Sequence, residues 1–419
     1  MCKRKGKCLK KDFSDGLEEN MGVYSQQTIK AINKKNIYML INADPGISRI
    51  QLANVTNLSK TTVSALVDEL IHEGYVTDEG SVESNRQGRK PNSLVVNSDG
   101  NCFLVINWRK RILETAIVTS SFEVEHVSET EVRIGENYAA QIEEQIKACI
   151  EQCCDRKKIL GICLVVPGMI DSEQEEIISM VLTLDEKEKV IQELRAGIQE
   201  YPLAVFNDTA CLAYAENAFG DMKGRNYVYL NMNEGVGAAL VYEGNILKGA
   251  TGMGTQFGHF SVDKNGEKCV CGNRGCLENR IGELALTKIA RECHAEGAFQ
   301  DPATILFKDV GKLAAEGNQD ALKMVEVLAA DLSYALGNLI AMFNPESVVI
   351  GGMGRKLGDI FLQDLQENVK ATGFQQFVSK VDIRFTRLRE EALLQGAAKY
   401  YMDMHYKFLE DMTDKLFLY

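Results

Sequence analysis

The 419-residue chain has no run of about 20 consecutive apolar residues, the length that a bilayer-spanning helix needs. Its first residues carry charge without the apolar stretch of a secretory signal. It also lacks an excess of positive charge, because 47 lysines and arginines stand against 59 aspartates and glutamates, a net charge of −12. These absences argue against a membrane span, against secretion and against nucleic acid binding over the whole surface. We therefore expect a cytoplasmic protein with no membrane partner.

The charge is divided unevenly along the chain. Residues 1–100 hold 14 lysines and arginines against 12 acidic residues, a net charge of +2, which leaves −14 for residues 101–419. Any contact with DNA is therefore expected in the front segment. The length leaves room for two or three domains with sizeable cores.

The twelve cysteines do not read as a disulfide framework. Three of them lie in one short motif and the others are scattered along the chain, whereas disulfide-rich scaffolds are small secreted domains. We expect reduced thiols.

A helix-turn-helix pattern begins near residue 28. Apolar residues at helical spacing predict a first helix that ends near Asp44, where Pro and Gly follow. Ser48 can cap a short second helix and Ser59 a third. In the third helix, four apolar residues at positions i, i+3, i+4 and i+7 predict a buried stripe: Val63, Leu66, Val67 and Leu70.

Two short strand-like runs, residues 75–77 and 94–96, follow these helices and enclose the basic segment 81–92. We interpret residues 21–97 as a winged helix-turn-helix domain, preceded by a flexible tail over residues 1–20. A solvated, charge-rich linker is the alternative for the basic segment. The expected DNA contacts are Ser48, Arg49, Lys60, Thr61, Thr62 and Ser64 in the helices, and Arg86, Arg89 and Lys90 in the wing.

Residues 258–278 read GHFSVDKNGEKCVCGNRGCLE and carry a metal-ligand pattern. One imidazole and three thiolates complete a tetrahedral zinc site, and with four protein ligands no position stays open for a reaction. We therefore expect a structural Zn²⁺ ion. Its predicted ligands are His259, Cys269, Cys271 and Cys276. The alternative is three buried free thiols and an unrelated histidine.

A Gly-His pair followed by Cys-x-Cys-Gly-x-x-Gly-Cys-Leu-Glu resembles the signature of the ROK family, which comprises sugar kinases and sugar-responsive repressors. Segments 167–171 (PGMID), 206–208 (FND) and 344–352 (NPESVVIGG) resemble the same family. The resemblance implies an α/β fold, with an N-terminal winged helix-turn-helix followed by a two-lobed ribonuclease-H-like domain of the actin/hexokinase type. This ROK domain is expected over residues 101–419, with the zinc loop at 259–276.

The kinases of this family carry Asp-x-Gly-Gly-Thr-Lys in their first hairpin, where bare backbone approaches the ATP phosphates. The matching positions here include Asn107, Arg109, Lys110 and Arg111, so the Asp and both glycines are replaced. In the second phosphate segment, Glu234 adds a carboxylate that would repel a triphosphate. We expect a decayed ATP site and no enzyme activity.

The resemblance also implies a sugar pocket of planar polar side chains. The positions that match the family's sugar contacts are Asn207, Asp208, His259 and Glu278, and Gln256 stands where the family has Glu. In the kinases the residue at Asp208 is the general base, so here it would be a relic of catalysis. In the alternative interpretation, Asn207 and Asp208 cap a helix and Glu278 pairs with Arg280.

These patterns together favour a transcriptional repressor whose binding to operator DNA is modulated by a monosaccharide. Three parts of the chain resemble those of xylose-responsive members: the winged helix-turn-helix domain (hereafter the head), the Gly-Arg-Lys-Pro segment and the Asn-Glu-Gly-Val-Gly-Ala segment. Xylose is therefore the candidate sugar. We expect a homodimer or a higher homo-oligomer. One alternative is an ATP-dependent ROK sugar kinase with a DNA-binding head. Another is an activator, or a repressor controlled by a partner protein instead of a sugar.

Overall fold

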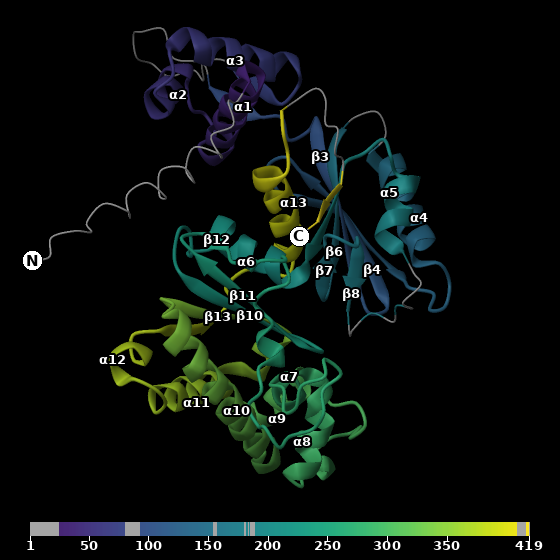
Figure 1. Ribbon diagram of the computed structural model, residues 1–419, viewed down its shortest axis with the longest axis vertical. Coiled ribbons are helices and arrows are strands. Elements are labelled where there is room, and N and C mark those ends of the chain that lie inside the picture. Colours follow the sequence, from purple (N-terminus) through teal and green to yellow (C-terminus); the bar gives the residue numbers. More distant parts are fainter. Residues whose placement is uncertain are drawn as a thin grey trace, which may run out of the picture. The chain divides into compact units, whose positions relative to one another are not determined.

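The structure is a computed structural model that describes residues 25–79, 93–153, 157–179, 182, 184, 189–408 and 416–418. The chain forms two compact units (Figure 1). The described residues up to Gly100, together with Lys407 and Phe408, make the first unit. The second unit contains the described residues 101–406 and the short strand at 416–418. The predicted tail at 1–20 lies outside the described residues.

The first unit has three helices and a two-stranded antiparallel sheet. They are α1 (Gln26–Ala43), α2 (Arg49–Thr56), α3 (Lys60–His72), β1 (Val76–Asp78) and β2 (Leu94–Val96). The predicted helices and the buried stripe of α3 are confirmed, because all four of its apolar residues are buried. Val76 pairs with Val96 in the hairpin. The predicted wing contacts Arg86, Arg89 and Lys90 lie outside the described residues.

Phe408, close to the end of the chain, is part of this first unit. Its ring centre lies 5.4 Å from that of Tyr38 and 4.9 Å from that of Tyr75. The ammonium group of Lys34 lies 5.9 Å from the same ring centre. The sequence interpretation placed Phe408 in the second domain, because no local signal indicates that the chain returns to the first unit.

The second unit has two lobes, each built on a mixed sheet. In the first lobe the strand order is β15-β9-β6-β3-β4-β5. The strands are β3 (Asn101–Arg109), β4 (Ile112–Thr119), β5 (Val124–Glu131), β6 (Lys158–Val166), β9 (Leu203–Asn207) and β15 (Leu416–Leu418). The meander β3-β4-β5 is antiparallel, whereas β6, β9 and β15 run parallel to β3. A separate small hairpin follows β6, with strands β7 (Met169–Asp171) and β8 (Glu176–Ile178).

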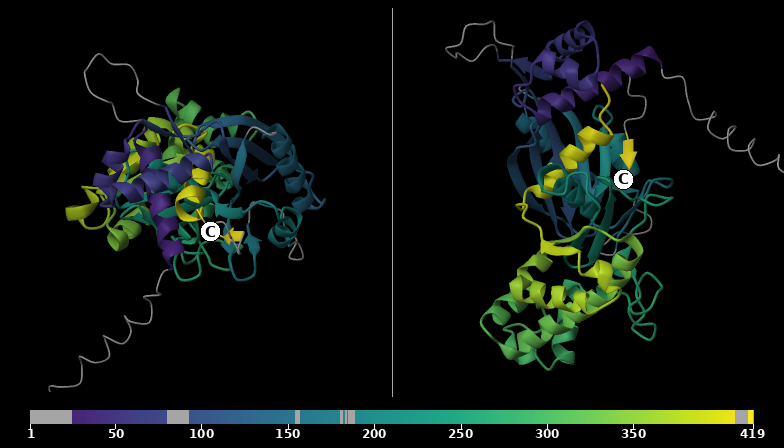
Figure 2. Two further views of the ribbon diagram at one scale, coloured as in Figure 1. Left: turned by 90° about the horizontal axis from the view of Figure 1, so that it is seen from above. Right: turned by 90° about the vertical axis from the view of Figure 1, so that its left-hand side faces the viewer.

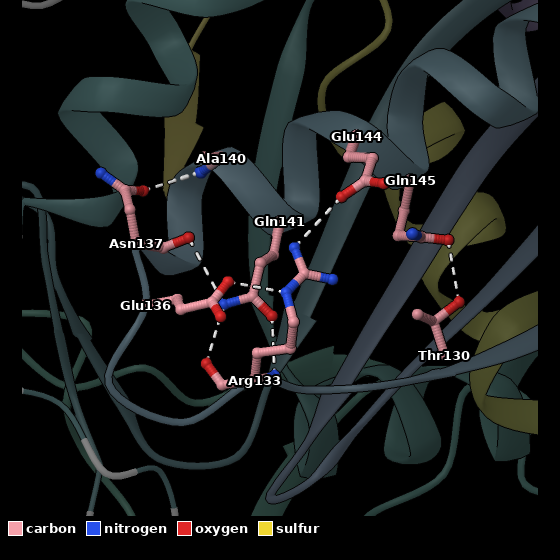
Figure 3. A network of polar contacts seen from close by, with 8 residues as sticks. All are labelled: Thr130, Arg133, Glu136, Asn137, Ala140, Gln141, Glu144 and Gln145. Atoms are coloured by element: carbon pink, nitrogen blue, oxygen red, sulfur yellow. Dashed lines mark hydrogen bonds and ion pairs between the residues drawn. The ribbon is translucent and has the colours of Figure 1, made fainter.

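Helices α4 (Tyr138–Cys153) and α5 (Val190–Gly197) cover one face of this sheet. The loop that leads into α4 is held by Arg133, whose guanidinium group pairs with Glu136 and Glu144 (Figure 3). The backbone N–H of Arg133 donates to the Gln141 side chain at 2.8 Å, and Gln141 donates back to the Arg133 carbonyl at 3.0 Å. These bonds fix the turn between β5 and α4.

The other face carries α13 (Ala392–Met404), which packs along α6 (Asp208–Phe219). Gly161 in β6 permits this approach, because a Cβ atom there would lie 2.3 Å from the Tyr401 ring. Tyr400, Tyr401 and Tyr406 are buried, as expected for core residues. Helix α6 also packs on the second sheet, so its N-terminus lies where the two lobes meet.

The second lobe has the strand order β12-β11-β10-β13-β14. These strands are β10 (Tyr227–Met232), β11 (Val236–Tyr242), β12 (Asn245–Ile246), β13 (Ser347–Gly352) and β14 (Asp382–Phe385). The helices form one group beside this sheet (Figure 2). They are α7 (Glu278–Ile281), α8 (Leu286–Glu292), α9 (Phe307–Ala315), α10 (Gln319–Phe343), α11 (Gly358–Lys370) and α12 (Gln375–Val378), with short 3₁₀ turns η1 (Phe257–His259), η2 (Glu283–Ala285), η3 (Glu296–Ala298) and η4 (Met353–Leu357).

Helix α10 is the one helix among the described residues that is long and apolar enough to cross a membrane. Of its most apolar window, 61% is buried inside the structure. Its apolar side chains pack in the core of the second lobe together with those of α9 and α11. The apolar character of α10 is therefore that of a core helix.

Candidate functional site

The four predicted metal ligands lie together in the second lobe. The ligand atoms of His259, Cys269, Cys271 and Cys276 all lie within 4.8 Å of one another. The Sγ atoms of Cys271 and Cys276 are 3.6 Å apart, and Cys269 Sγ is 3.7 Å from His259 Nδ1. A tetrahedral zinc ion with Zn–S bonds of about 2.3 Å separates two sulfur ligands by about 3.8 Å. The cluster therefore has the donor set and the spacing of a metal site.

The loop around these ligands is folded tightly. Gly275 has a φ of +59°, and a Cβ atom there would lie 1.9 Å from the Asp263 carbonyl oxygen. Only glycine fits this position, because any side chain would collide with backbone. Ser261 pairs with Cys276 in an isolated β-bridge, which brings the last cysteine back beside His259.

A cavity of about 920 Å³ lies in the second unit. All five predicted sugar contacts line it: Asn207, Asp208, Gln256, His259 and Glu278. They come from the end of β9, the start of α6, the turn η1 and the start of α7. Segments that are far apart in the sequence thus place their polar side chains around one cavity.

Asn207 caps α6, as one of the two sequence interpretations expected. Its Oδ1 accepts a hydrogen bond from the Ala210 N–H at 2.9 Å, and its Nδ2 donates to the Gly168 carbonyl at 2.7 Å. Asp208 is the first residue of the helix, and its Oδ1 accepts from the Thr209 N–H at 2.6 Å. Burial raises the pKa of the Asp208 carboxyl to about 6, against the lowering effect of its hydrogen bonds.

Glu278 does not pair with Arg280. Its Oε2 accepts a hydrogen bond from the Val236 N–H at 2.9 Å, which ties the start of α7 to the turn between β10 and β11. Arg280 pairs instead with Asp331 at 2.8 Å and with Glu292 at 3.0 Å. The Gln256 amide is exposed and donates to the carbonyl of Met253 at 3.3 Å.

Two basic residues of the β3–β4 turn, Arg109 and Lys110, are paired with carboxylates. Arg109 forms ion pairs with Glu129 and Glu114. Lys110 Nζ lies 3.4 Å from Glu234 Oε2, which joins the β3–β4 turn to the β10–β11 turn. Asn107 donates to Glu114 Oε2 at 2.7 Å. The sequence interpretation named these residues but not their partners.

In the first unit, the predicted DNA contacts separate into two groups. Ser48 is buried and caps α2, and Arg49 pairs with Asp68 at 2.7 Å, so both bind within the unit. Lys60, Thr61 and Thr62 are exposed in the first turn of α3, and Ser64 is half-buried.

Two polar residues that sequence reasoning missed also line the cavity. Asn231 at the end of β10 donates to Asp208 Oδ2 at 3.2 Å, and Asn233 donates to Asn231 Oδ1 at 3.0 Å. The one available signal was that both asparagines precede the glycines of the β10–β11 turn.

Comparison with known proteins agrees with this architecture. Residues 110–403 match the ROK family, and residues 31–77 match a winged helix-turn-helix DNA-binding family. The chain is 29% identical to the xylose repressor of Caldicellulosiruptor bescii over 384 residues, which cover 88% of this chain and 94% of that protein.

The chain is also similar to solved structures, among them a transcriptional regulator and a kinase. The crystal structure of a ROK family transcriptional regulator, described as a homologue of the Escherichia coli Mlc protein, has 26% identity and a TM-score of 0.76, covering 88% of this chain and 95% of that chain. A ROK family glucokinase from Streptomyces griseus, in complex with glucose and AMPPNP, has 18% identity and a TM-score of 0.60, covering 71% of this chain and 98% of that chain, and shows the fold alone. The predicted fold is confirmed: a winged helix-turn-helix followed by an actin/hexokinase-type domain. The chain belongs to the ROK family.

Proposed function

We propose that this protein is a cytoplasmic transcriptional repressor that binds operator DNA through its first unit and a monosaccharide in the cavity of its second unit. The observation that carries the proposal is the gathering of Asn207, Asp208, His259 and Glu278 around one cavity beside the metal cluster. The similarity to a xylose repressor over most of the chain favours xylose as the sugar.

The cavity offers the groups that a sugar needs. The carboxylates of Asp208 and Glu278 each keep acceptor positions beyond the bonds that they already make, so they can accept from ligand hydroxyls. His259 directs Nδ1 to the cysteine cluster, which leaves the other ring nitrogen for the ligand. The Gln256 amide can both donate a hydrogen bond to a ligand hydroxyl and accept one from it, whereas an ionised carboxylate at this position could only accept.

We propose that the metal is a structural Zn²⁺ ion. Three thiolates and one imidazole are the donor set of closed zinc sites, and four protein ligands leave no open position. When bound, zinc would supply no chemistry of its own; it would hold the loop and the ring of His259 against the cavity.

The DNA contacts are proposed at the start of α3. Lys60, Thr61 and Thr62 are exposed there, and the first turn contains no acidic residue. The positive end of the helix dipole then adds to the charge of Lys60 in attracting phosphate. In a homodimer, two such helices about 34 Å apart would reach successive major grooves. We assign Ser48 and Arg49 structural roles.

We also propose that the ATP site has decayed. Arg109 and Lys110 replace the glycines that would approach the phosphates, and carboxylates already neutralise both side chains. A neutral monosaccharide is therefore a better candidate effector than a sugar phosphate. One observation favours the alternative kinase, because the pKa of about 6 at Asp208 suits a general base.

Three measurements test the proposal. A sugar at 100 times its dissociation constant stabilises the folded protein by about 2.7 kcal/mol, so a thermal-shift screen of monosaccharides, xylose first, identifies the effector. That sugar must then change the mobility of an operator complex; a complex that no sugar alters would indicate control by a partner protein. Turnover of ATP with the same sugar at about 1 s⁻¹ or faster would establish the kinase instead.

A further inference from the structure

The side chain of Asp208 is bonded to Asn231, which is in turn bonded to Asn233. Asn231 is 3% exposed, and its Nδ2 donates to Asp208 Oδ2 at 3.2 Å and to Thr209 Oγ1 at 3.1 Å. Its Oδ1 accepts from Asn233 Nδ2 at 3.0 Å. Both amide hydrogens of Asn231 are therefore used, and both hold the first turn of α6.

Asn233 carries the connection further into the second lobe. Its Oδ1 accepts from the Met353 N–H at 2.8 Å, and its carbonyl accepts from the Glu283 N–H at 2.9 Å. Gly352, with a φ of +71°, lets the turn after β13 come this close, because a Cβ atom there would lie 2.6 Å from Asn231 Oδ1. A continuous set of hydrogen bonds thus joins Asp208 to two turns of the second lobe.

The bonds to Asp208 leave part of its carboxylate free. Thr209 donates its N–H and its hydroxyl to Oδ1, and Asn231 donates to Oδ2. A carboxylate has about four acceptor positions, so about one remains for a ligand hydroxyl.

Hydrogen bonds to an ionised carboxylate favour the ionised form, whereas burial opposes it. Burial raises the pKa of Asp208 to about 6, and the bonds from Thr209 and Asn231 act in the opposite direction. Two titratable groups that interact electrostatically with this carboxyl are Cys211 on α6 and Tyr229 on β10. Burial raises the pKa of both, so they stay neutral at pH 5–8. The other charged or titratable residues that line the same cavity are Arg109, Lys110, Arg111, Glu234, Lys248, His259, Glu267, Lys268, Glu278, Glu283, Lys288 and Tyr400.

We propose that Asn231 is a positioning residue for effector binding: its amide holds the Asp208 carboxylate so that the remaining oxygen lone pair accepts a hydrogen bond from a sugar hydroxyl. Asn233 fixes Asn231 in turn and ties this arrangement to the turn after β13. The inference rests on the proposed sugar-binding function of the cavity.

The test is the pH dependence of sugar affinity in the full-length protein. D-xylose is the first probe, followed by the other monosaccharides of the screen, and titration calorimetry gives the dissociation constant between pH 5 and pH 8.5. Wild-type affinity is expected to fall below about pH 6, where Asp208 becomes protonated. In Asn231→Leu the ionised Asp208 carboxylate loses the hydrogen bond from Asn231. The midpoint of the pH dependence of sugar affinity is therefore expected to rise by about one pH unit.

Two further variants separate positioning from general destabilisation. Asn231→Thr retains one hydroxyl donor, so its midpoint should lie between those of the wild type and of Asn231→Leu; it also serves if the leucine variant does not fold. Gln141→Leu removes another buried amide, one that does not line the cavity, and should lower thermal stability without moving the midpoint of the pH dependence.

The outcomes distinguish a failure of the proposed sugar-binding function from a failure of the positioning role of Asn231. If no monosaccharide binds the wild type, the proposed function of the cavity is wrong and this inference fails with it. If a sugar binds but both Asn231 variants keep the wild-type midpoint, the positioning role alone is overturned.

Discussion

The substitution Asp208→Asn should make the free protein more stable relative to the wild type as the pH rises from 5 to 8. The pKa of this carboxyl is about 6 in the folded protein, against an ordinary value of 3.8. Because the folded-state pKa is raised, the stabilisation that protonation contributes is complete below pH 3.8 and is lost as the pH rises through about 6. The difference of about two between these pKa values corresponds to about 3 kcal/mol over the whole pH range.

Part of this effect lies in a convenient pH range. Between pH 5 and pH 8 the wild type should lose roughly 1 kcal/mol, since Asp208 passes from mostly protonated to ionised. An asparagine does not titrate, so the variant should gain that amount relative to the wild type. The variant should also lose sugar binding, because an amide cannot replace both carboxylate oxygens as acceptors.

The assay is urea unfolding of both proteins at pH 5, 6, 7 and 8. The quantity of interest is the difference in unfolding free energy between variant and wild type, in which pH effects of all other groups cancel. Asp301→Asn, at an exposed position, is the matched control for the chemical change from carboxylate to amide. If the difference in unfolding free energy between Asp208→Asn and the wild type stays constant from pH 5 to pH 8, burial does not raise the pKa of Asp208 and the reasoning is refuted.

Three other predictions concern the metal, the head and the DNA. Cys276→Ser should lose the roughly one zinc per chain expected in the wild type by atomic absorption, and should melt at a lower temperature; a variant that keeps its zinc would contradict the ligand assignment. Phe408→Ala removes a ring that packs on Tyr38 and Tyr75, so hydrogen exchange in α1 should become faster, by an amount corresponding to about 2 kcal/mol; unchanged exchange would mean that the ring adds nothing. Lys60→Ala should weaken DNA binding equally for all sequences and reduce the salt slope by about 0.9; an unchanged slope would place Lys60 away from phosphate.

Much of the head could be predicted from sequence because its signals are local. Ser48 and Ser59 each cap a helix through a bond to a residue three positions later. Capping acts within one turn, so neighbouring residues suffice to recognise it. Whether a capping residue such as Ser48 also faces DNA is not a local property, since its burial depends on the packing of the whole unit.

The cavity shows the opposite case. Five of its lining residues could be named because motifs of a known family carry them, but their bonding partners could not. Asn233 bonds to Met353 across 120 residues of sequence, and Lys110 pairs with Glu234 from another lobe. No pattern within one segment reports such a pair, because the meeting of two turns depends on the order of the strands that bear them.

The sequence by itself determined the metal cluster and the helices of the head. In both, the interacting groups are close along the chain, so spacing and side-chain type fix their geometry. Only the tertiary structure decided that carboxylates neutralise Arg109 and Lys110, that Asn231 supports Asp208, and that Phe408 returns to the head. These contacts join residues from different elements of the fold, and they exist only after those elements have packed together.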